Sequence, residues 1–299
     1  MARRARLDAE LVRRGLARSR EQAADLVHAG RVRVDGQTAV KPATAVAPAT
    51  ALLIDFAAVG PSYASRGGHK LAGALDDLHN LGGPTVAGRR CLDAGASTGG
   101  FTDVLLRRGA GHVVAVDVGY GQLAWALRTD PRVSVVDRTN VRSLTPEAIG
   151  GVVQLAVADL SFISLRVVLP ALVGCVAGDG ELLVMVKPQF EVGRERLGAG
   201  GVVRDPRLRG EAVLAVAGAA AQHGLGVAGV VRSVLPGPAG NVEFFLWLRP
   251  DAPPVDPAEV AAATAEPAPA PDAGSAAPAA GSAVPAARSA APAPTSGAP

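Results

Sequence analysis

The chain has few of the residues on which several classes of protein depend. It holds two cysteines, Cys91 and Cys175, each inside an apolar run, so neither a disulfide framework nor zinc-type cysteine spacing is present. The five histidines are scattered and form no ligand cluster, so we expect no metal. No stretch approaches the ~18 apolar residues of a membrane-spanning helix, and the basic N-terminus lacks the apolar region of a signal peptide. We therefore expect a cytoplasmic protein.

Lysine is scarce as well. Only three of the 30 basic residues are lysines, namely Lys41, Lys70 and Lys187, and arginine stands at all the others. A lysine can lose its proton in a suitable environment, whereas arginine effectively cannot. Each lysine kept in this background is therefore a candidate for proton chemistry, although chance could place any one of them.

Large side chains are nearly missing from residues 251–299, where 20 alanines and 11 prolines fill 31 of 49 positions. So little apolar surface does not offset the entropy lost on ordering, and we expect a disordered tail. The tail has a net charge of −4, which leaves +7 on residues 1–250 of a chain whose total is +3. Residues 1–41 alone carry ten bases against five acids. This basic block favours a nucleic acid partner, with a solvated basic surface as the alternative.

The N-terminal segment has the pattern of two helices followed by a hairpin. An apolar stripe from Leu7 ends at Gly15, and Ser19-Arg-Glu-Gln22 has the spacing of a capping box before a second helix that ends at Gly30. Asp35-Gly36 is a strong signal for a two-residue hairpin turn. The order of helix, cap, glycine and hairpin over residues 6–42 resembles the alpha-L RNA-binding module first known from a ribosomal protein.

That resemblance implies contacts to the phosphates of structured RNA, which position the protein without specifying sequence. The candidate RNA-binding residues are Arg6, Arg13, Arg14, Arg18, Arg20, Arg31, Arg33 and Lys41.

From about residue 65 to 249, apolar strands alternate with helices. We expect strands at 90–93, 113–117, 133–136, 152–158, 181–186, 226–234 and 242–248, and helices at 71–78, 100–108, 124–128, 165–176 and 207–223. Continuous apolar strands separated by helices predict an α/β, Rossmann-like parallel sheet covered on both faces, ending in an antiparallel pair. The domains we expect are an α+β RNA-binding domain at 1–60, a linker at 61–68, the sheet domain at 69–250 and the tail at 251–299.

A glycine-rich turn follows the first strand of this sheet, in the run CLDAGASTGGFT that starts at Cys91. Doubly wound sheets bind nucleotide-like ligands at such a turn. A phosphate-binding loop would have lysine where Phe101 stands, and a dinucleotide fingerprint would have a glycine near Ala96 and Ser97. The acid Asp93 suits a cation, which favours S-adenosylmethionine, a ligand with an ammonium and a sulfonium but no phosphate. Glycines needed only for close packing are the alternative.

Two further acids end the next strands. Asp117 is placed to accept from both hydroxyls of a ribose, and Asp137 to meet an adenine edge, unless both are ordinary strand-end caps. The cofactor-binding residues we expect are Asp93, Gly95, Ser97, Thr98, Gly99, Gly100, Phe101, Asp117 and Asp137.

Four charged residues sit where chemistry is expected. Asp159 ends the fourth strand, and Lys187 ends the fifth, where Pro188 favours an extended backbone, so adjacent strands should bring the two together. Lys70 begins a helix just before the sheet. Glu243 lies in an apolar strand and, unless it faces solvent, must be paired or functional, because burying a lone carboxylate is too costly.

In order and context these four residues match the Lys-Asp-Lys-Glu tetrad of FtsJ-like RNA 2′-O-methyltransferases. The motifs SRGGHKL, LDAGASTGGFTD, ADLSFISL, VKPQFEVGRE and NVEFFLWL, behind the alpha-L module, resemble the TlyA (hemolysin A) family. The resemblance covers residues 6–249. It implies metal-free methyl transfer from S-adenosylmethionine to the ribose of a cytidine in ribosomal RNA (16S and/or 23S) within ribosomal subunits.

On this reading Lys187 is the base, Asp159 orients it, and Lys70 and Glu243 hold the ribose and one another. A basic, glycine-rich stretch follows Lys187 and is either an RNA-facing lid or a solvated loop; its arginines are Arg194, Arg196, Arg204, Arg207 and Arg209.

Two other functions compete with methyl transfer. A membrane-lysing protein, as the family's older name suggests, would need an amphipathic or apolar membrane segment, and we find none beyond the strand patterns. A non-catalytic RNA-binding assembly factor would not need the tetrad, which is intact.

Overall fold

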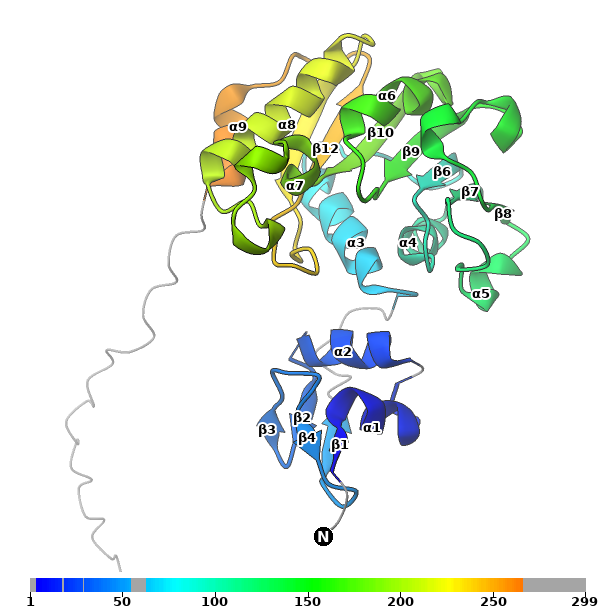
Figure 1. Cartoon of the computed structure of the whole chain (residues 1–299). Helices are drawn as coiled ribbons and strands as arrows, with labels where there is room; N and C mark the ends of the chain where they lie inside the picture. Colours follow the sequence, from blue (N-terminus) through cyan, green and yellow to red (C-terminus); the bar gives the residue numbers. More distant parts are fainter. Residues whose placement is uncertain (1–3, 18, 29, 55–62, 266–299) are drawn as a thin grey trace, which may run out of the picture. The chain divides into compact units, whose positions relative to one another are not determined.

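The computed structural model describes residues 4–17, 19–28, 30–54 and 63–265 (Figure 1). Residues 4–54 form a small α+β domain. Its elements are β1 (Ala5–Arg6), α1 (Leu7–Arg13), α2 (Arg20–His28), β2 (Val32–Val34), β3 (Gln37–Thr38), β4 (Ala45–Val46) and β5 (Leu52–Ile54). Strand β1 pairs with β4, and β2 lies between β3 and β5. The core of this domain includes the fully buried side chains of Leu7, Leu11 and Val32.

The local signals in the N-terminal sequence are confirmed. The Ser19 hydroxyl accepts a hydrogen bond from the backbone N–H of Gln22 at 3.1 Å and so caps α2. Gly30, just past the end of α2, has a φ of 67°. Asp35 and Gly36 both have positive φ, as a two-residue hairpin turn between β2 and β3 requires.

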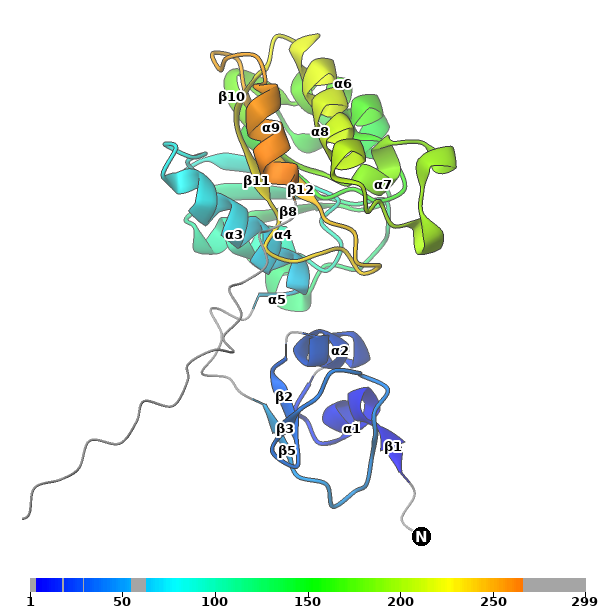
Figure 2. The same cartoon turned by 90° about the vertical axis from the view of Figure 1, so that its left-hand side faces the viewer.

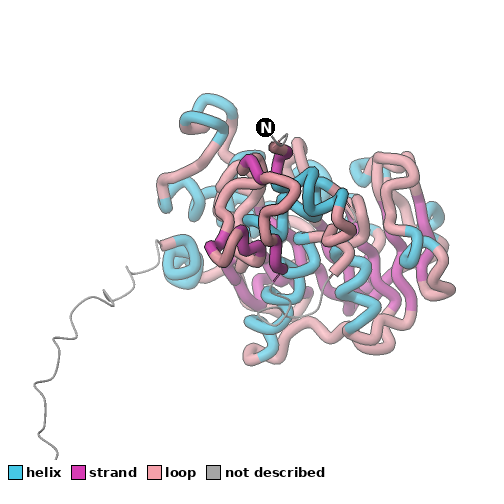
Figure 3. The backbone as a smooth tube through the Cα atoms, turned by 90° about the horizontal axis from the view of Figure 1, so that it is seen from below, coloured by secondary structure: helices cyan, strands magenta, loops and turns pink. Residues whose placement is uncertain are grey.

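Residues 63–265 are built on a seven-stranded sheet, and strands and helices alternate along much of this range (Figure 3). The strands are β6 (Arg90–Ala94), β7 (His112–Val116), β8 (Val133–Val136), β9 (Val153–Ala158), β10 (Val176–Val186), β11 (Gly226–Arg232) and β12 (Phe244–Arg249). Their order across the sheet is β11-β12-β10-β9-β6-β7-β8. Strand β12 runs antiparallel to both neighbours, and the other pairs are parallel. The expected α/β class with an antiparallel pair at one end is confirmed.

Helices cover both faces of the sheet (Figures 1 and 2). One face packs against α6 (Leu165–Gly174), α8 (Pro206–Ala221) and α9 (Pro257–Thr264). The other packs against α3 (Arg66–His79), α4 (Gly100–Arg107) and α5 (Trp125–Arg128). The shorter helices are α7 (Pro188–Glu191) and the 3₁₀ turns η1 (Val141–Ser143), η2 (Glu147–Ile149), η3 (Arg194–Arg196) and η4 (Ala199–Gly201).

Two predicted boundaries are wrong. Helix α3 begins at Arg66, inside the expected linker, so Lys70 lies in its second turn instead of starting it. The chain also does not lose its structure at Asp251, because α9 follows, with the Asp256 carboxylate accepting from the N–H of Ala258 and Val260 buried. An aspartate cap, a proline at the first helical position and a run of alanines form a helix despite the poor composition. The rest of the expected tail, 266–299, lies outside the described residues.

Candidate active site

Two of the expected site residues meet at the carboxyl edge of the sheet. Asp159 follows β9 and Lys187 follows the neighbouring parallel strand β10. The Nζ of Lys187 lies 2.5 Å from Oδ1 of Asp159 and donates to the Ser161 hydroxyl at 3.1 Å. The expected proximity of Asp159 and Lys187 is confirmed, and the structure adds Ser161, which the sequence reasoning missed. Ser161 could have been noticed as a polar residue two positions after the strand-end acid.

The other two charged residues form a second pair. The Nζ of Lys70 lies 2.5 Å from Oε2 of Glu243, and their side chains are 6 % and 1 % exposed. Glu243, the residue just before β12, is buried, so the alternative in which it faces solvent is wrong. Two charges buried this deeply stabilise each other, and removing either leaves an uncompensated charge.

Strand register places both ion pairs at one edge. Val186 is opposite Phe244 in the antiparallel pair of β10 and β12. Lys187 follows Val186 and Glu243 precedes Phe244, so the two backbones face each other just beyond the paired residues. A Cβ at Gly237 would lie 2.6 Å from Oε1 of Glu243, so the turn before β12 packs closely against this carboxylate.

The glycine-rich turn packs directly on these elements. Gly95 has a φ of 90°, and a Cβ there would lie 2.5 Å from the carbonyl oxygen of Asp159. A Cβ at Gly68, in the first turn of α3, would lie 2.9 Å from the carbonyl oxygen of Gly100, the first residue of α4. The glycines therefore do serve close packing, and that packing brings the turn beside the loop that carries Asp159.

Asp93 offers an unsatisfied buried charge beside this turn. Its Oδ2 accepts from the Thr102 hydroxyl at 2.6 Å, while Oδ1 has no hydrogen-bond partner among the described residues. Complete burial raises the pKa of Asp93 to about 7, and the charges of Asp159 and Asp117 add to this rise. A buried, unpaired carboxylate oxygen suits a cationic ligand, so the site fits the ammonium of S-adenosylmethionine.

The remaining expected cofactor residues divide into two groups. Asp117 accepts from the N–H of Ser97 at 2.8 Å and from the N–H of Gly119 at 2.6 Å, which ties it to the glycine-rich turn. Gly99 has a φ of 97° and caps α4. The carbonyl oxygen of Thr98, in the same turn, accepts a hydrogen bond from the N–H of Ala124 at 3.2 Å.

Two members lie less favourably for a cofactor. Asp137 is 3.1 Å from the guanidinium of Arg128 and also accepts from the N–H of Gly121. The buried ring of Phe101 stacks on Phe245, with centroids 6.0 Å apart, so its side chain is a core residue. The Phe101 ring therefore packs against the sheet, and the expected part of Phe101 in cofactor binding stays a prediction that would have to use its backbone.

An exposed aromatic pair at the same edge was missed by the sequence reasoning. The Phe162 side chain is 91 % exposed, has a positive φ of 64° and lies 5.3 Å from the ring of Phe190. A non-glycine residue in this backbone region is strained, and such strain concentrates at functional sites. The signal was available: each phenylalanine stands three residues after a strand-end charge, Asp159 or Lys187.

The basic residues of the N-terminal domain are held by two buried acids. The Asp8 carboxylate pairs with Arg6 at 2.8 Å and Arg20 at 3.1 Å, and Glu10 pairs with Arg13 at 2.6 Å. Hydrogen bonds from these arginines lower the pKa of both carboxyls to about 2. The guanidinium groups therefore stay charged and fixed while their side chains remain more than half exposed.

The other candidates for RNA contact differ in exposure. Arg33 and Lys41 are exposed and Arg31 is half-buried, whereas Arg18 lies outside the described residues.

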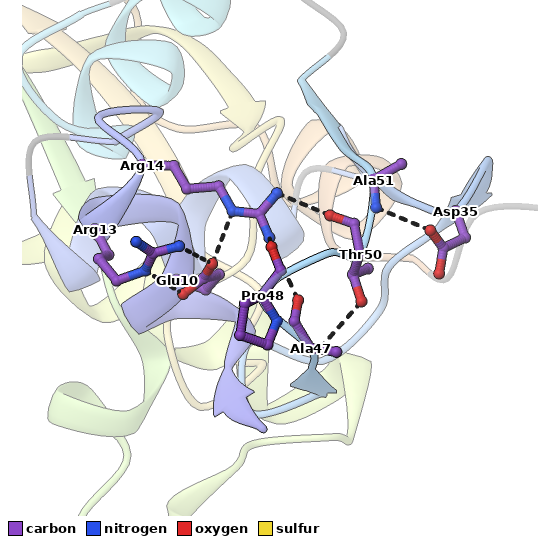
Figure 4. A network of polar contacts seen from close by, with 8 residues as sticks. All are labelled: Glu10, Arg13, Arg14, Asp35, Ala47, Pro48, Thr50 and Ala51. Atoms are coloured by element: carbon purple, nitrogen blue, oxygen red, sulfur yellow. Dashed lines mark hydrogen bonds and ion pairs between the residues drawn. The ribbon is translucent and has the colours of Figure 1, made fainter. Parts of the chain in front are cut away.

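Arg14 has a different role from the one expected (Figure 4). It binds Glu10 at 2.8 Å, and its guanidinium donates to the carbonyl oxygens of Thr50 at 2.8 Å and Pro48 at 2.9 Å. Its side chain is 22 % exposed, against 63 % for Arg13 on the same carboxylate. Arg14 therefore joins the end of α1 to the segment before β5, and its donors are used inside the domain.

Replacing Arg14 with alanine should destabilise the N-terminal domain, because the carbonyls of the 47–50 segment lose their donor. We expect a loss of about 1–3 kcal/mol, as for other half-buried groups left unsatisfied. Amide hydrogen exchange in α1 and around Ala51 should then be about 5- to 150-fold faster in the full chain. Arg13→Ala is the matched control, since it removes an exposed partner of Glu10 and should leave exchange nearly unchanged. Equal effects of the two variants would refute the assignment.

The basic stretch after Lys187 is partly built into the fold. Arg209 is buried and donates to the carbonyl of Val203 at 3.1 Å, so the RNA-facing lid is wrong for this residue. The buried amide of Asn241 accepts from the N–H of Val203 and donates to the carbonyl of Gly201. Arg196 pairs with Glu211 at 2.5 Å. The other expected lid residues, Arg194, Arg204 and Arg207, are exposed.

Comparison with known proteins agrees with this architecture. Residues 63–250 match the model of the FtsJ-like methyltransferase family, and residues 5–50 match the S4 domain. The 16S/23S rRNA (cytidine-2′-O)-methyltransferase TlyA of Mycobacterium tuberculosis is 66 % identical over 249 residues, which are 83 % of this chain and 91 % of the relative. Hemolysin A of Brachyspira hyodysenteriae is 32 % identical over 80 % of this chain and 98 % of its own length.

A solved structure extends the likeness to three dimensions. A hemolysin-named protein from Streptococcus thermophilus superposes with a TM-score of 0.69 at 37 % identity, covering 88 % of this chain and 95 % of its own. Membership of this methyltransferase family implies S-adenosylmethionine as the methyl donor, and the unpaired buried oxygen of Asp93 fits its ammonium. With its S4 domain and its FtsJ-like sheet, the chain belongs to the TlyA family.

Proposed function

We propose that this protein transfers a methyl group from S-adenosylmethionine to the 2′-hydroxyl of a cytidine in 16S or 23S ribosomal RNA, within ribosomal subunits in the cytoplasm. The observation that carries the proposal is the meeting of two lysine–carboxylate pairs at one sheet edge, Lys70–Glu243 buried and Lys187–Asp159 partly buried, beside the unpaired oxygen of Asp93. The substrate class follows from the activity named for the relative that is 66 % identical. The S4 domain supports an RNA substrate.

Each residue has a distinct task in this proposal. S-adenosylmethionine supplies a methyl group already activated on a sulfonium, so the electrophile needs no metal. Asp93 would bind the ammonium of S-adenosylmethionine. Asp117, fixed by the N–H groups of Ser97 and Gly119, would accept from the hydroxyls of the cofactor's own ribose. The proton of the attacked 2′-hydroxyl passes to the lone pair of the Lys187 amine in its neutral form, and Asp159 and Ser161 hold this nitrogen in place. A positioned base of this kind contributes roughly 10²–10⁴-fold to the rate.

Other residues position the RNA. The buried Lys70–Glu243 pair lies at the same strand edge as Lys187, and we assign it to holding the substrate ribose there. The open face of Phe162 offers a stacking surface to an unpaired base, which is how single-stranded RNA bases are commonly held. In the N-terminal domain Arg6, Arg13 and Arg20 supply phosphate contacts that set orientation, not sequence.

The hemolysin names of two relatives point to membrane lysis as the second candidate. In the described ranges, no helix has the length and apolar character needed to cross a bilayer. The apolar strands are covered by helices on both faces and are not available to a membrane. A liposome-leakage assay separates the two functions, and leakage at concentrations that give no methyl transfer would favour lysis.

The decisive test is methyl transfer from radiolabelled S-adenosylmethionine to purified small and large ribosomal subunits. Label that survives alkaline hydrolysis as a dinucleotide establishes 2′-O-methylation, because the modified ribose blocks cleavage of the following phosphodiester. Nuclease protection then locates the labelled segment and names the subunit. S-adenosylmethionine binding without transfer to either subunit would contradict the proposal and favour a non-catalytic assembly factor.

A further inference from the structure

Glu191 is a buried carboxylate that the proposed reaction does not use. It is the last residue of α7, the short helix that begins directly after Lys187, and is only 6 % exposed. Burial raises the pKa of Glu191, while hydrogen bonds from Ser164 and Leu165 oppose the rise. A carboxylate in such a place must be held by several donors to be tolerated.

Among the described residues, its donors all come from the start of α6, the helix that follows the loop carrying Asp159. Oε2 of Glu191 accepts from the Ser164 hydroxyl at 2.6 Å, and Oε1 accepts from the N–H of Leu165 at 2.7 Å. The guanidinium of Arg166 lies 3.3 Å from Oε2 and also donates to the carbonyl of Glu191 at 3.1 Å. Ser164, Leu165 and Arg166 open α6, the helix that follows Asp159 by a few residues.

The segment after β9 and the segment after β10 are thereby joined by three contacts. Nearest the sheet edge, Lys187 contacts Asp159 and Ser161. Farther along, the rings of Phe162 and Phe190 lie together. At the far end, Glu191 binds the first turn of α6. Of these three contacts, the one at Glu191 has the most hydrogen bonds, and it shares no atom with the reacting groups.

We propose that Glu191 is a positioning residue for methyl transfer. It fixes the 187–191 segment, which includes α7, against the 159–166 segment, which ends in the first turn of α6, so that Lys187, Ser161 and the phenylalanine pair keep their places. The inference rests on the proposed methyltransferase function. Loss of this anchor lets the two segments slide while the sheet and the glycine-rich turn stay as they are. The rate of transfer therefore depends on Glu191, and the binding of S-adenosylmethionine at Asp93 does not.

Glu191→Gln tests this in the full chain. The amide nitrogen of glutamine cannot accept. The variant therefore loses either the Leu165 N–H or the charged contact with Arg166, and in the second case the Ser164 hydroxyl must turn from donor to acceptor, with little change in size. Displacements on the scale of 1 Å at a reacting group can cost about 100-fold, and we expect the single-turnover rate to fall 10- to 100-fold. The Kd of S-adenosylmethionine and of the ribosomal subunit should stay within about twofold.

Glu181→Gln is the matched control. Glu181 lies on β10, the strand that ends at Lys187, and it too is buried and accepts from two side chains, Trp247 and Arg89, both at 2.8 Å. It sits in the middle of that strand, six residues before Lys187. A general loss of stability would affect both variants alike, whereas the inference requires a large rate loss for Glu191→Gln and a change within twofold for Glu181→Gln.

Two further measurements keep the inference falsifiable. Ser164→Ala removes one donor to Glu191, so its rate loss should not add to that of Glu191→Gln; additive losses would overturn the shared contact. Hydrogen exchange at residues 160–166, measured without RNA, should be faster in Glu191→Gln than in wild type. Unchanged exchange or an unchanged rate refutes the positioning role of Glu191. If wild type labels no ribosomal subunit, the proposed function is refuted instead, and the exchange measurement alone then shows whether Glu191 holds the two segments together.

Discussion

Lys187→Arg should bind S-adenosylmethionine and ribosomal subunits normally and transfer methyl groups at least about 100-fold more slowly. Arginine keeps the positive charge and can still pair with Asp159, which lies 2.5 Å from the lysine nitrogen. It effectively cannot lose a proton, so it cannot accept the proton of a 2′-hydroxyl. General-base catalysis contributes roughly 10²–10⁴-fold, and that factor is the expected loss.

The measurement is single-turnover transfer of labelled methyl to the ribosomal subunit that wild type modifies. Calorimetric binding of S-adenosylmethionine shows whether the site is intact. Lys41→Arg is the control. It makes the same change at an exposed lysine, and arginine keeps the positive charge that a phosphate contact needs, so the rate of transfer should stay near that of wild type. A Lys187→Arg enzyme with at least half of the wild-type rate would exclude Lys187 as the base.

The residues at the sheet edge could be found from sequence because parallel strands end together. A strand-end acid at Asp159 and a strand-end lysine at Lys187 need only neighbouring strands to meet, and β9 and β10 are neighbours. Lys187 was also conspicuous because the chain uses so little lysine. Both signals are local, so neither required knowledge of the complete topology.

The partner of Glu243 could not be derived in this way. An antiparallel strand pair at the end of the chain can join a sheet by either strand, and only the insertion of β12 beside β10 brings Glu243 opposite Lys187. The ion pair with Lys70 then links residues 173 positions apart. Such contacts are set by strand order and by the path of a preceding helix, which spacing along the sequence does not encode.

Charge was a weaker guide in the N-terminal domain. Arg13 and Arg14 are adjacent in the same basic segment, so the sequence predicts the same RNA contact for both. Arg13 is exposed, however, whereas Arg14 donates to backbone carbonyls of the 47–50 segment. Their difference depends on which side of α1 meets that segment. Composition also failed at α9, where Asp256 and Pro257 start a helix that small alanine side chains allow to pack closely.

Binding of S-adenosylmethionine should strengthen as pH rises through about 7. Burial raises the pKa of Asp93 to about 7, so near neutral pH about half of the free molecules carry a protonated, neutral carboxyl there. Only the carboxylate pairs with an ammonium, so binding favours the charged form, lowers the pKa and releases a proton. Below pH 7 the apparent affinity should fall by nearly tenfold per pH unit, and above about pH 8 it should level off.

Calorimetry at pH 6, 7 and 8 measures this directly, and two buffers of different ionisation enthalpy report the proton released. The expected difference in Kd between pH 6 and pH 8 is about tenfold. Asp93→Asn should bind weakly at all three pH values without the pH dependence, because the amide has no charge to titrate and Oδ1 is the atom left unpaired. The same affinity of wild type at pH 6 and pH 8 would mean that Asp93 does not face the ammonium, and the unpaired oxygen would then need another partner, such as a buried water.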